Sequence, residues 1–440
     1  MIVIIGVLAA ITIVAYTGIS QQAGAAGLKS DLKQASTQLE LAKAQSVDGN
    51  YPSNDSAIKK SNKTTFQYTL TGTNYCLSAT NDTQAFHLDS SVGDIQDGVC
   101  TGHTPPSGGG GSGSGWKVVS TGNYHACAID SNDKAYCWGD NYLGQLGINN
   151  TIDDVISIPS PVYTLGVLSG KTLKSIDSGY GYACAIASDD QAYCWGNNYR
   201  GQLGNNSTSN TSVPVAVDTS GVLSGKTIKS ISTDRYNTCA IASDDQAYCW
   251  GANFGGLGNN SPTSSSTPLA VDTSGVLSGK TIKSISVGND AVCVVASDNK
   301  AYCWGDNSDG KLGNNSTTDS QVPVAVYAGG VLSGKNILSV SSGRYQTCAI
   351  ASDNKAYCWG NNDYGAIGDG SNSSSSIPVA VDTSGVLSGK LISSISVGED
   401  FVCAISSGGQ AYCWGYNDDS ELGNNSTAES DVPVAVSPKT

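Results

Sequence analysis

The sequence predicts a multidomain chain: a long N-terminal α-helix with a small antiparallel β head, followed by an all-β propeller of six four-stranded blades. Three observations support this fold class. A segment with two cysteines separated by nine residues and followed by Trp-Gly occurs six times, at steps of 54 to 57 residues. An apolar run opens the chain and continues into an amphipathic stripe, and a Gly/Ser-rich stretch precedes the repeats. A β-type repeat of this length indicates a propeller or a solenoid.

Each cysteine pair fits a β-hairpin. In the fifth copy, placing Cys348 opposite Cys358 pairs Ile350 with Ala356 and leaves a three-residue loop. Such a loop favours a left-handed last residue, and that position holds Asp, Asn or Gly in all six copies. Opposed residues in non-hydrogen-bonded pairs have Cα atoms about 4.5 Å apart, which is within disulfide reach.

We therefore predict six disulfides within hairpins, each contributing about 3 kcal/mol in the chain-entropy model. The pairs are Cys127–Cys137, Cys184–Cys194, Cys239–Cys249, Cys293–Cys303, Cys348–Cys358 and Cys403–Cys413. The alternative is twelve small buried hydrophobic residues, because free cysteine packs well. Zinc is disfavoured because close-spaced ligand pairs are missing. A disulfide-rich, polar, acidic chain indicates a place outside the cytoplasm.

The first 103 residues predict a helix and a small β head. Residues 1–16 are apolar but fewer than the roughly 20 that a spanning helix needs, and an amphipathic stripe continues the helix to residue 46. Residues 51–103 contain short alternating stretches that are typical of strands. A disulfide between Cys76 and Cys100 would tie the end of this head to its sheet, although the sequence also permits Cys100 to pair with a cysteine of the repeats.

The stretch Ile4-Ile5-Gly6-Val7-Leu8-Ala9-Ala10-Ile11, with the helix and the β head, resembles type IV pilins and pseudopilins over residues 1–103. The resemblance implies a mature chain that starts about eight residues before Met1 and includes a glutamate. An ordinary signal anchor is the alternative. The resemblance also implies an inner-membrane stage and then a helical homopolymer, whose core would contain Ile4, Ile5, Val7, Leu8, Ile11, Ile13 and Val14.

Residues 104–115 predict a flexible linker, and residues 116–440 contain the six repeats. Each repeat supplies an entering strand, the hairpin, a turn after Trp-Gly and an exit strand, which together make one propeller blade. Motifs such as Trp195-Gly196 followed by Gly201-Gln202-Leu203-Gly204 resemble the RCC1 repeat, a family that usually closes seven blades. Depending on where a blade is divided, residues 116–119 and 432–436 can complete one sheet and close the ring.

The variable positions gather at the open end of each hairpin. Residues just before each first cysteine and just after each Trp-Gly differ among the copies, whereas the hairpin tips scarcely vary. Their Tyr and Arg content is typical of recognition surfaces, although drift of exposed loops is the alternative. The candidate binding residues are Tyr124, His125, Tyr142, Tyr180, Tyr182, Tyr199, Arg235, Tyr236, Phe254, Arg344, Tyr345, Tyr364 and Phe401.

The sequence contains little that favours catalysis. His87, His103 and His125 are dispersed, and the Asp-rich turns miss the EF-hand alternation, so we expect no enzymatic activity, cofactor or metal site. The net charge of −14 disfavours a nucleic-acid partner. We predict an extracellular, pilus-like filament subunit whose propeller adheres to another cell, protein or glycan. The alternatives are a pseudopilin of a secretion or DNA-uptake apparatus and a surface-anchored, inhibitor-like propeller.

Overall fold

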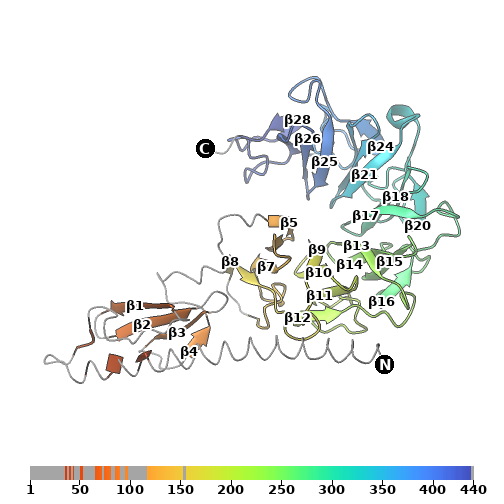
Figure 1. Ribbon diagram of the computed structural model, residues 1–440. Helices are drawn as coiled ribbons and strands as arrows, with labels where there is room; N and C mark the ends of the chain where they lie inside the picture. Colours follow the sequence, from red (N-terminus) through yellow and green to blue (C-terminus); the bar gives the residue numbers. More distant parts are fainter. Residues whose placement is uncertain are drawn as a thin grey trace, which may run out of the picture. The chain divides into compact units, whose positions relative to one another are not determined.

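The computed structural model describes residues 116–151 and 155–437 and, before them, residues 35–36, 39–40, 43, 50–52, 65–71, 74–80, 85–89 and 95–97. The chain divides into two compact units, Met1–Ser114 and Gly115–Thr440. Figure 1 shows the strands of both units, coloured along the sequence.

The described strands of the first unit form an antiparallel sheet in the order β1-β2-β3-β4. Its strands are β1 (Thr65–Thr71), β2 (Asn74–Thr80), β3 (Ala85–Asp89) and β4 (Ile95–Asp97). Leu77 and Ala79 of β2 form a small core with Ala35 and Leu39, because alternate residues of a strand share one face. Cys76 forms a disulfide, and its predicted partner Cys100 lies outside the described residues.

The predicted fold class must be corrected for this first unit. The described residues are almost entirely strands, turns and loops, and their elements include no long N-terminal helix with a pilin-like head. The predicted helix over residues 1–46, with its filament-core positions 4–14, lies outside the described residues except at five helical positions. An apolar run and a helical stripe are local patterns, and they do not specify what a segment packs against.

The second unit contains six four-stranded antiparallel sheets, each formed by consecutive strands, so the predicted six blades are confirmed. The strands of blades 1–3 are β5 (Trp116–Thr121), β6 (His125–Asp130), β7 (Ala135–Gly139), β8 (Ile156–Pro161), β9 (Leu173–Ser178), β10 (Tyr182–Ala187), β11 (Ala192–Gly196), β12 (Thr211–Ala216), β13 (Ile228–Thr233), β14 (Asn237–Ala242), β15 (Ala247–Gly251) and β16 (Ser265–Ala270).

The strands of blades 4–6 are β17 (Ile282–Gly288), β18 (Ala291–Ala296), β19 (Ala301–Gly305), β20 (Ser320–Ala325), β21 (Ile337–Ser342), β22 (Gln346–Ala351), β23 (Ala356–Gly360), β24 (Ser375–Ala380), β25 (Ile392–Val397), β26 (Phe401–Ser406), β27 (Ala411–Gly415) and β28 (Ser430–Ala435), and a 3-10 helix η3 (Gly330–Leu332) links blades 4 and 5. The first strands of consecutive blades contact one another, so they line the centre of the blade array.

The second and third strands of each blade form the predicted hairpin. In blade 5, Cys348 lies opposite Cys358 and Ile350 lies opposite Ala356. The last residue of the loop, Asn354, is left-handed with φ 55°. All six predicted disulfides within hairpins are confirmed, each with a Cα–Cα distance of 4.1 Å.

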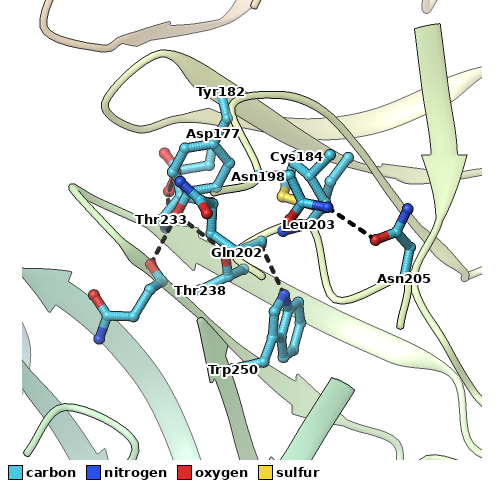
Figure 2. Close-up of a disulfide and its surroundings, with 12 residues drawn as sticks. Asp177, Tyr182, Cys184, Asn198, Gln202, Leu203, Asn205, Thr233, Thr238 and Trp250 are labelled. Carbon is cyan, nitrogen blue, oxygen red and sulfur yellow. Dashed lines mark hydrogen bonds between the residues drawn. A yellow bond between two sulfur atoms is a disulfide. The ribbon is translucent and has the colours of Figure 1, made fainter. Parts of the chain in front are cut away.

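The Trp of each Trp-Gly motif joins its blade to the preceding one. In blade 3, Trp250 is fully buried and its Nε1 donates a 2.9 Å hydrogen bond to the backbone oxygen of Gln202 in blade 2 (Figure 2). Its ring packs against Gly204, where a Cβ atom would lie 2.5 Å from the indole nitrogen. The same Trp–carbonyl bond forms at five junctions between consecutive blades.

A buried asparagine shapes the turn that follows each Trp-Gly. In blade 2, Asn198 accepts a 3.0 Å hydrogen bond from the Leu203 amide and donates to the carbonyls of Ser207 and Ser209. The corresponding residue in every blade accepts the same amide bond, including Asn417 in blade 6. These asparagines therefore build the turns and leave the neighbouring side chains free to vary.

The two ends of the propeller do not complete one sheet, as the sequence had suggested they could. Strand β5 pairs with β6 and strand β28 pairs with β27, so the first and last strands of the propeller belong to two different sheets. Each end blade already has its own four strands, and residues 116–119 are therefore not available to complete blade 6.

Candidate functional site

The loops at the open end of the hairpins form one surface, which we call the loop face. It consists of the loop before each first cysteine (residues 122–124, 179–181, 234–236, 289–290, 343–345 and 398–400) and the turn after each Trp-Gly. A backbone hydrogen bond joins the two loops within each blade, as between the Asp140 amide and the Tyr124 oxygen in blade 1. The sequence therefore places twelve variable loops on this face.

An aromatic row crosses the loop face of blades 1–3. The rings of Tyr124 and Tyr180 lie 5.6 Å apart between centroids, those of Tyr180 and Tyr236 lie 6.3 Å apart, and those of Tyr236 and Phe254 lie 6.5 Å apart. The end members Tyr124 and Phe254 are 60% and 54% exposed. Four large rings from three blades thus form one continuous and accessible surface, which we call the aromatic row.

Arg235 lies between two rings of the aromatic row. Its guanidinium carbon is 5.6 Å from the ring centre of Tyr180 and 5.0 Å from that of Tyr236. A hydrogen bond with Tyr124, and then burial, raises the pKa of Tyr180. The row can bind flat apolar groups on its rings and carboxylates on the guanidinium.

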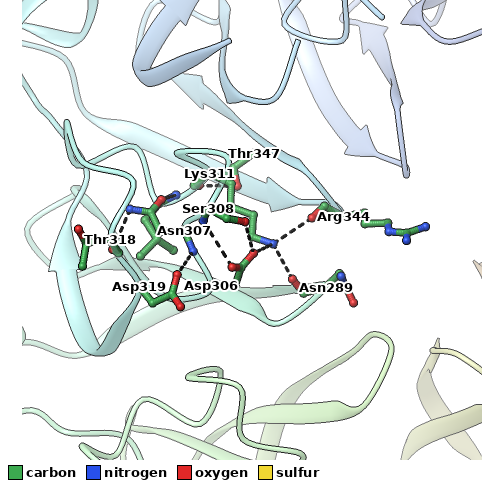
Figure 3. Close-up of polar contacts among 10 residues, drawn as sticks. Asn289, Asp306, Asn307, Ser308, Lys311, Thr318, Asp319, Arg344 and Thr347 are labelled. Atoms are coloured by element: carbon green, nitrogen blue, oxygen red, sulfur yellow. Dashed lines mark hydrogen bonds and ion pairs between the residues drawn. The ribbon is translucent and has the colours of Figure 1, made fainter. Parts of the chain in front are cut away.

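In blade 4, the carboxylates of Asp290, Asp306 and Asp309 lie around a buried lysine. Lys311 Nζ lies 2.6 Å from Asp306 Oδ2 and donates to the backbone oxygens of Asn289 (2.8 Å) and Arg344 (3.0 Å) (Figure 3). Burial alone would raise the pKa of Asp306, but its hydrogen bond and ion pair with Lys311 lower it overall. The ammonium thus joins loops of blades 4 and 5.

Asp234 lies where the two halves of the loop face meet. Burial, followed by repulsion from Asp290 and Asp177, raises its pKa to about 7. Burial likewise raises the pKa of Asp177 to about 6, although the carboxylate accepts hydrogen bonds from the Thr233 amide (2.6 Å) and from Ser120 Oγ (3.0 Å). The pKa values of these two carboxyl groups lie close to neutrality because neighbouring blades bring the acidic side chains together in a partly desolvated environment.

Two of the candidate binding residues are buried. His125 is 4% exposed, and burial lowers its pKa to about 4. Tyr182 is fully buried and donates a 2.8 Å hydrogen bond to the Asn237 backbone oxygen in blade 3 (Figure 2). Both side chains are buried because each lies on the same face of its strand as the buried cysteine two residues later. They therefore lie beneath the loop face and support it.

The other candidates lie on the loop face but outside the aromatic row. Tyr142 and Tyr199 are 65% and 67% exposed, and Tyr364 packs against Tyr416 with ring centres 5.2 Å apart. Arg344 lies over the Tyr345 ring at 4.7 Å and also forms an ion pair with Glu399. Phe401 is half-buried at the start of β26.

The candidate set missed Asp234 and Lys311, although both depart from the repeat pattern. Asp234 stands where the five other blades have Gly, and Lys311 stands where the others have Gln, Gly, Ala or Glu. A charged residue that replaces a glycine or an amide in one copy of a repeat was the signal that sequence reasoning could have used.

Among the described residues, no group of three or more His, Cys, Asp or Glu side chains could hold a metal ion. A shallow pocket of about 340 Å³ lies away from the loop face and is lined by Lys229, Asp245 and Lys283 among others. Within the part of the chain that the structure describes, no helix has the length and apolar character needed to cross a membrane.

Models of two related families match the propeller. The model of the RCC1-like domain matches residues 159–440, and that of the regulator of chromosome condensation (RCC1) repeat matches residues 116–145. The chain belongs to the RCC1-like domain family.

Two RCC1-like relatives illustrate the range of the family. The chain is 27% identical over 321 residues to the E3 ubiquitin-protein ligase HERC2 of Homo sapiens, in a match that covers 72% of this chain and 6% of the ligase. It is 29% identical over 321 residues to the ultraviolet-B receptor UVR8 of Arabidopsis thaliana, in a match that covers 72% of this chain and 69% of the receptor. The chain thus spans only a small part of the ligase.

Solved structures show the same RCC1-like fold. Human WBSCR16 has a TM-score of 0.65 at 17% identity, covering 74% of this chain and 83% of that chain. Yeast RCC1 (Prp20), in its structure with Kap60, has a TM-score of 0.62 at 18% identity, covering 73% of this chain and 75% of that chain. At these identities the likeness shows the fold alone.

The RCC1-like relatives correct the predicted function. They are a ligase, a receptor and a yeast protein studied for its binding to Gsp1p and histones, and neither family model covers the residues that resemble pilins. The predictions of a pilus or fimbrium subunit, of a homopolymer through the N-terminal helix and of an inner-membrane stage are therefore wrong. The repeats carry the relationship to the relatives named above.

Proposed function

We propose that this RCC1-like propeller is a binding module that recognises another protein through the aromatic row, and that it performs no catalysis. The observation that carries the proposal is the continuous contact of Tyr124, Tyr180, Tyr236 and Phe254 across three blades, with Arg235 between two of the rings. Tyr and Arg dominate the energetic centres of protein interfaces, because large rings gain contact area while losing little conformational freedom.

The exposure of the row supports a protein as the ligand. The end rings of the row, Tyr124 and Phe254, are 60% and 54% exposed. Small molecules favour enclosed pockets, whereas protein partners bind open surfaces that carry rigid anchors. The names of relatives point the same way, since yeast Prp20p is described with Gsp1p, histones and Kap60.

We also propose that the propeller works outside the cytoplasm. Six disulfides in one domain would be reduced by the cytosolic thiol pool of most cells, whereas they persist in an oxidising compartment. Mass spectrometry of the protein isolated from its own cells under thiol-blocking conditions tests this. Alkylated hairpin cysteines would contradict the proposed location.

The binding role is tested with a displayed library of random peptides, screened against the full chain and a variant with Tyr124, Tyr180, Arg235 and Tyr236 replaced by Ala. We expect peptides that bind the natural chain to lose at least tenfold in affinity for this variant. A control variant carries Ile158→Ala and Leu338→Ala, which remove exposed apolar side chains outside the loop face, and it should bind normally. Equal losses in both variants, or no loss in the first, would contradict the proposal.

A further inference from the structure

A short motif recurs where the turn after Trp-Gly leads into the fourth strand of a blade. In blade 2 it reads Gly204-Asn205-Asn206-Ser207-Thr208, and the same five residues stand at positions 313–317 in blade 4 and 423–427 in blade 6. Its last three residues, Asn-Ser-Thr, match the Asn-X-Ser/Thr tripeptide of an N-glycosylation acceptor, in which X is not proline. The contacts of each residue show which positions of the motif the fold itself requires.

The fold requires the first asparagine and the serine. Asn205 Oδ1 accepts a 3.1 Å hydrogen bond from Nδ2 of Asn198, the buried asparagine that shapes the turn (Figure 2). Ser207 Oγ accepts a 3.1 Å hydrogen bond from the Ser209 amide. The corresponding residues of blades 4 and 6 form the same two bonds. These two positions of the motif are therefore part of the turn.

The second asparagine has a backbone role but an unused side chain. Asn206 is left-handed with φ 59°, and its amide donates a 2.9 Å hydrogen bond to the backbone oxygen of Ser266 in strand β16 of blade 3. Its side chain is exposed, as are those of Asn315, Asn425 and the motif's threonines. Among the described residues, no hydrogen bond reaches these side chains. The turn thus uses neither the amide nor the hydroxyl that define an acceptor.

The other blades change residues but keep the tripeptide in or beside this turn. In blade 1 the left-handed and exposed Asn149 begins Asn149-Asn150-Thr151. In blade 5, Gly370 is the left-handed residue, and Asn372-Ser373-Ser374 follows with Asn372 exposed. In blade 3, Asn260 keeps the left-handed backbone and the exposure, but Pro262 stands where the hydroxyl residue is needed. Blade 3 therefore provides a natural comparison.

The exposed asparagines lie toward the outer rim of the blades. The amide of each left-handed residue binds the fourth strand of the next blade, and fourth strands form one edge of each sheet. The first strands contact one another at the centre, and the loops with Tyr124, Tyr180 and Tyr236 follow those strands directly. A group attached at the rim would stand beside the edge strands. Edge strands are prone to pair with other chains, and a bulky solubilising group beside them opposes such pairing.

We propose that five exposed asparagines are acceptors of N-linked sugar chains: Asn149, Asn206, Asn315, Asn372 and Asn425. In this reaction the side-chain amide nitrogen bonds to the anomeric carbon of a phosphate-activated oligosaccharide. The bond from that carbon to the phosphate oxygen breaks, the phosphate leaves with the electron pair, and the nitrogen loses a proton. The inference rests on the proposed location outside the cytoplasm, because such tripeptides are acceptors in exported proteins, and it is independent of the proposed binding role.

Peptide mapping by tandem mass spectrometry tests the proposal on the full chain, isolated from its own cells under thiol-blocking conditions. We expect a sugar mass on Asn206, Asn315 and Asn425. Asn260 should be unmodified, because it shares their backbone and exposure but lacks the tripeptide. The hydrogen-bonded first asparagine of each motif should also be unmodified. Unmodified side chains at all five proposed acceptors would overturn the proposal.

The same digest separates this inference from the proposed location, since it also reports the state of the hairpin cysteines. Intact disulfides together with unmodified asparagines would overturn the sugar attachment and leave the location in place. Alkylated cysteines together with unmodified asparagines would contradict both.

Two variants at Thr208, produced in the same cells, identify the acceptor within blade 2. Thr208→Val removes the exposed hydroxyl at nearly constant size, whereas Thr208→Ser keeps it. We expect Thr208→Val to lower the sugar-bearing fraction of the Asn206 peptide at least tenfold, although it leaves the overlapping tripeptide Asn205-Asn206-Ser207 intact. Thr208→Ser should retain the sugar. Sugar that persists in Thr208→Val would place the attachment on another residue and overturn the assignment to Asn206.

Pro262→Thr provides the converse test in blade 3. The substitution completes the tripeptide that begins at Asn260, and residue 262 is exposed and precedes strand β16. We expect a sugar mass on Asn260 in this variant and none in the natural chain. If Asn260 stays unmodified while the other blades carry sugar, the exposed turn and the tripeptide together do not define the acceptor, and the proposal is overturned.

Discussion

The two halves of the loop face have the same backbone but differ in side-chain chemistry. Blades 1–3 present a row of four aromatic rings with Arg235 over two of them. Blade 4 presents carboxylates around Lys311, and blade 5 repeats an Arg-Tyr pair as Arg344 and Tyr345. Both halves keep the hairpin disulfides, the buried asparagines and the Trp–carbonyl bonds. Because these repeated contacts set the backbone, the few positions between them can change from aromatic to acidic without altering a blade.

The largest expected effect comes from removing the lysine that organises the acidic half. Lys311→Met would leave Asp306 and two backbone oxygens without their donor, and we expect a loss of about 3 kcal/mol in the free energy of unfolding. Chemical denaturation at pH 7 measures it.

Lys311→Gln is the matched control, because blade 1 has Gln145 at the same position. There the amide donates a 2.8 Å hydrogen bond to Asp140, which corresponds to Asp306. The Gln variant should therefore lose only about 1 kcal/mol, the net value of a typical hydrogen bond. Equal losses for Met and Gln would mean that the interaction of Lys311 with the loops of blades 4 and 5 depends on its charge alone.

The comparison with the sequence shows why the blades were predictable and the loop face less so. Cysteine spacing fixes the register of Cys348 with Cys358, since a hairpin has few ways to place them opposite each other. The same alternation could have excluded His125, which lies two residues before Cys127 on the buried side of β6. The role of Lys311 could not be predicted, because its acceptors come from loops 22 and 33 residues away.

The predictions about the two ends of the propeller and about the N-terminal unit were wrong for a different reason. Strand patterns predict which residues pair within a sheet, but the angle between neighbouring blades depends on the packing of whole faces. Nothing in residues 116–119 distinguishes a strand that completes blade 6 from one that opens blade 1. The helical stripe had the same limitation, because amphipathic spacing identifies a packed face without identifying its partner.

An intermediate effect is expected at Asp234, where the halves meet. Its pKa of about 7 in the folded chain exceeds the ordinary value of 3.8, so between these values the folded chain binds a proton that the unfolded chain lacks. The contribution of this group to stability is therefore complete below pH 3.8 and is lost as the pH rises through 7. Asp234→Asn should stabilise the protein by roughly 2 kcal/mol at pH 8 and by little at pH 4.

The test is the difference between the unfolding free energies of Asp234→Asn and the natural chain, measured from pH 4 to pH 8. His125, whose pKa of about 4 lies below its ordinary 6.5, changes stability over part of the same range. Because both proteins contain His125, its contribution cancels in the difference. A difference that does not change with pH would refute the raised pKa of Asp234.

The smallest effect is expected from a substitution that tests whether Arg235 acts on the aromatic row through stacking or through charge. Arg235→Lys keeps the positive charge but removes the flat guanidinium that lies over Tyr180 and Tyr236, so we expect a loss of about 0.5 kcal/mol in stability. Peptides selected on the natural chain should bind this variant about fivefold more weakly, because the two rings lose the group that holds them in place.

Arg344→Lys is the control in the acidic half, where the pairing with Glu399 can be kept by an ammonium, and it should leave peptide binding unchanged. If both lysine variants weaken binding equally, the peptides respond to general changes in the loop face and the two halves do not act separately. If neither does, charge alone accounts for the arginine and the rings bind without its support.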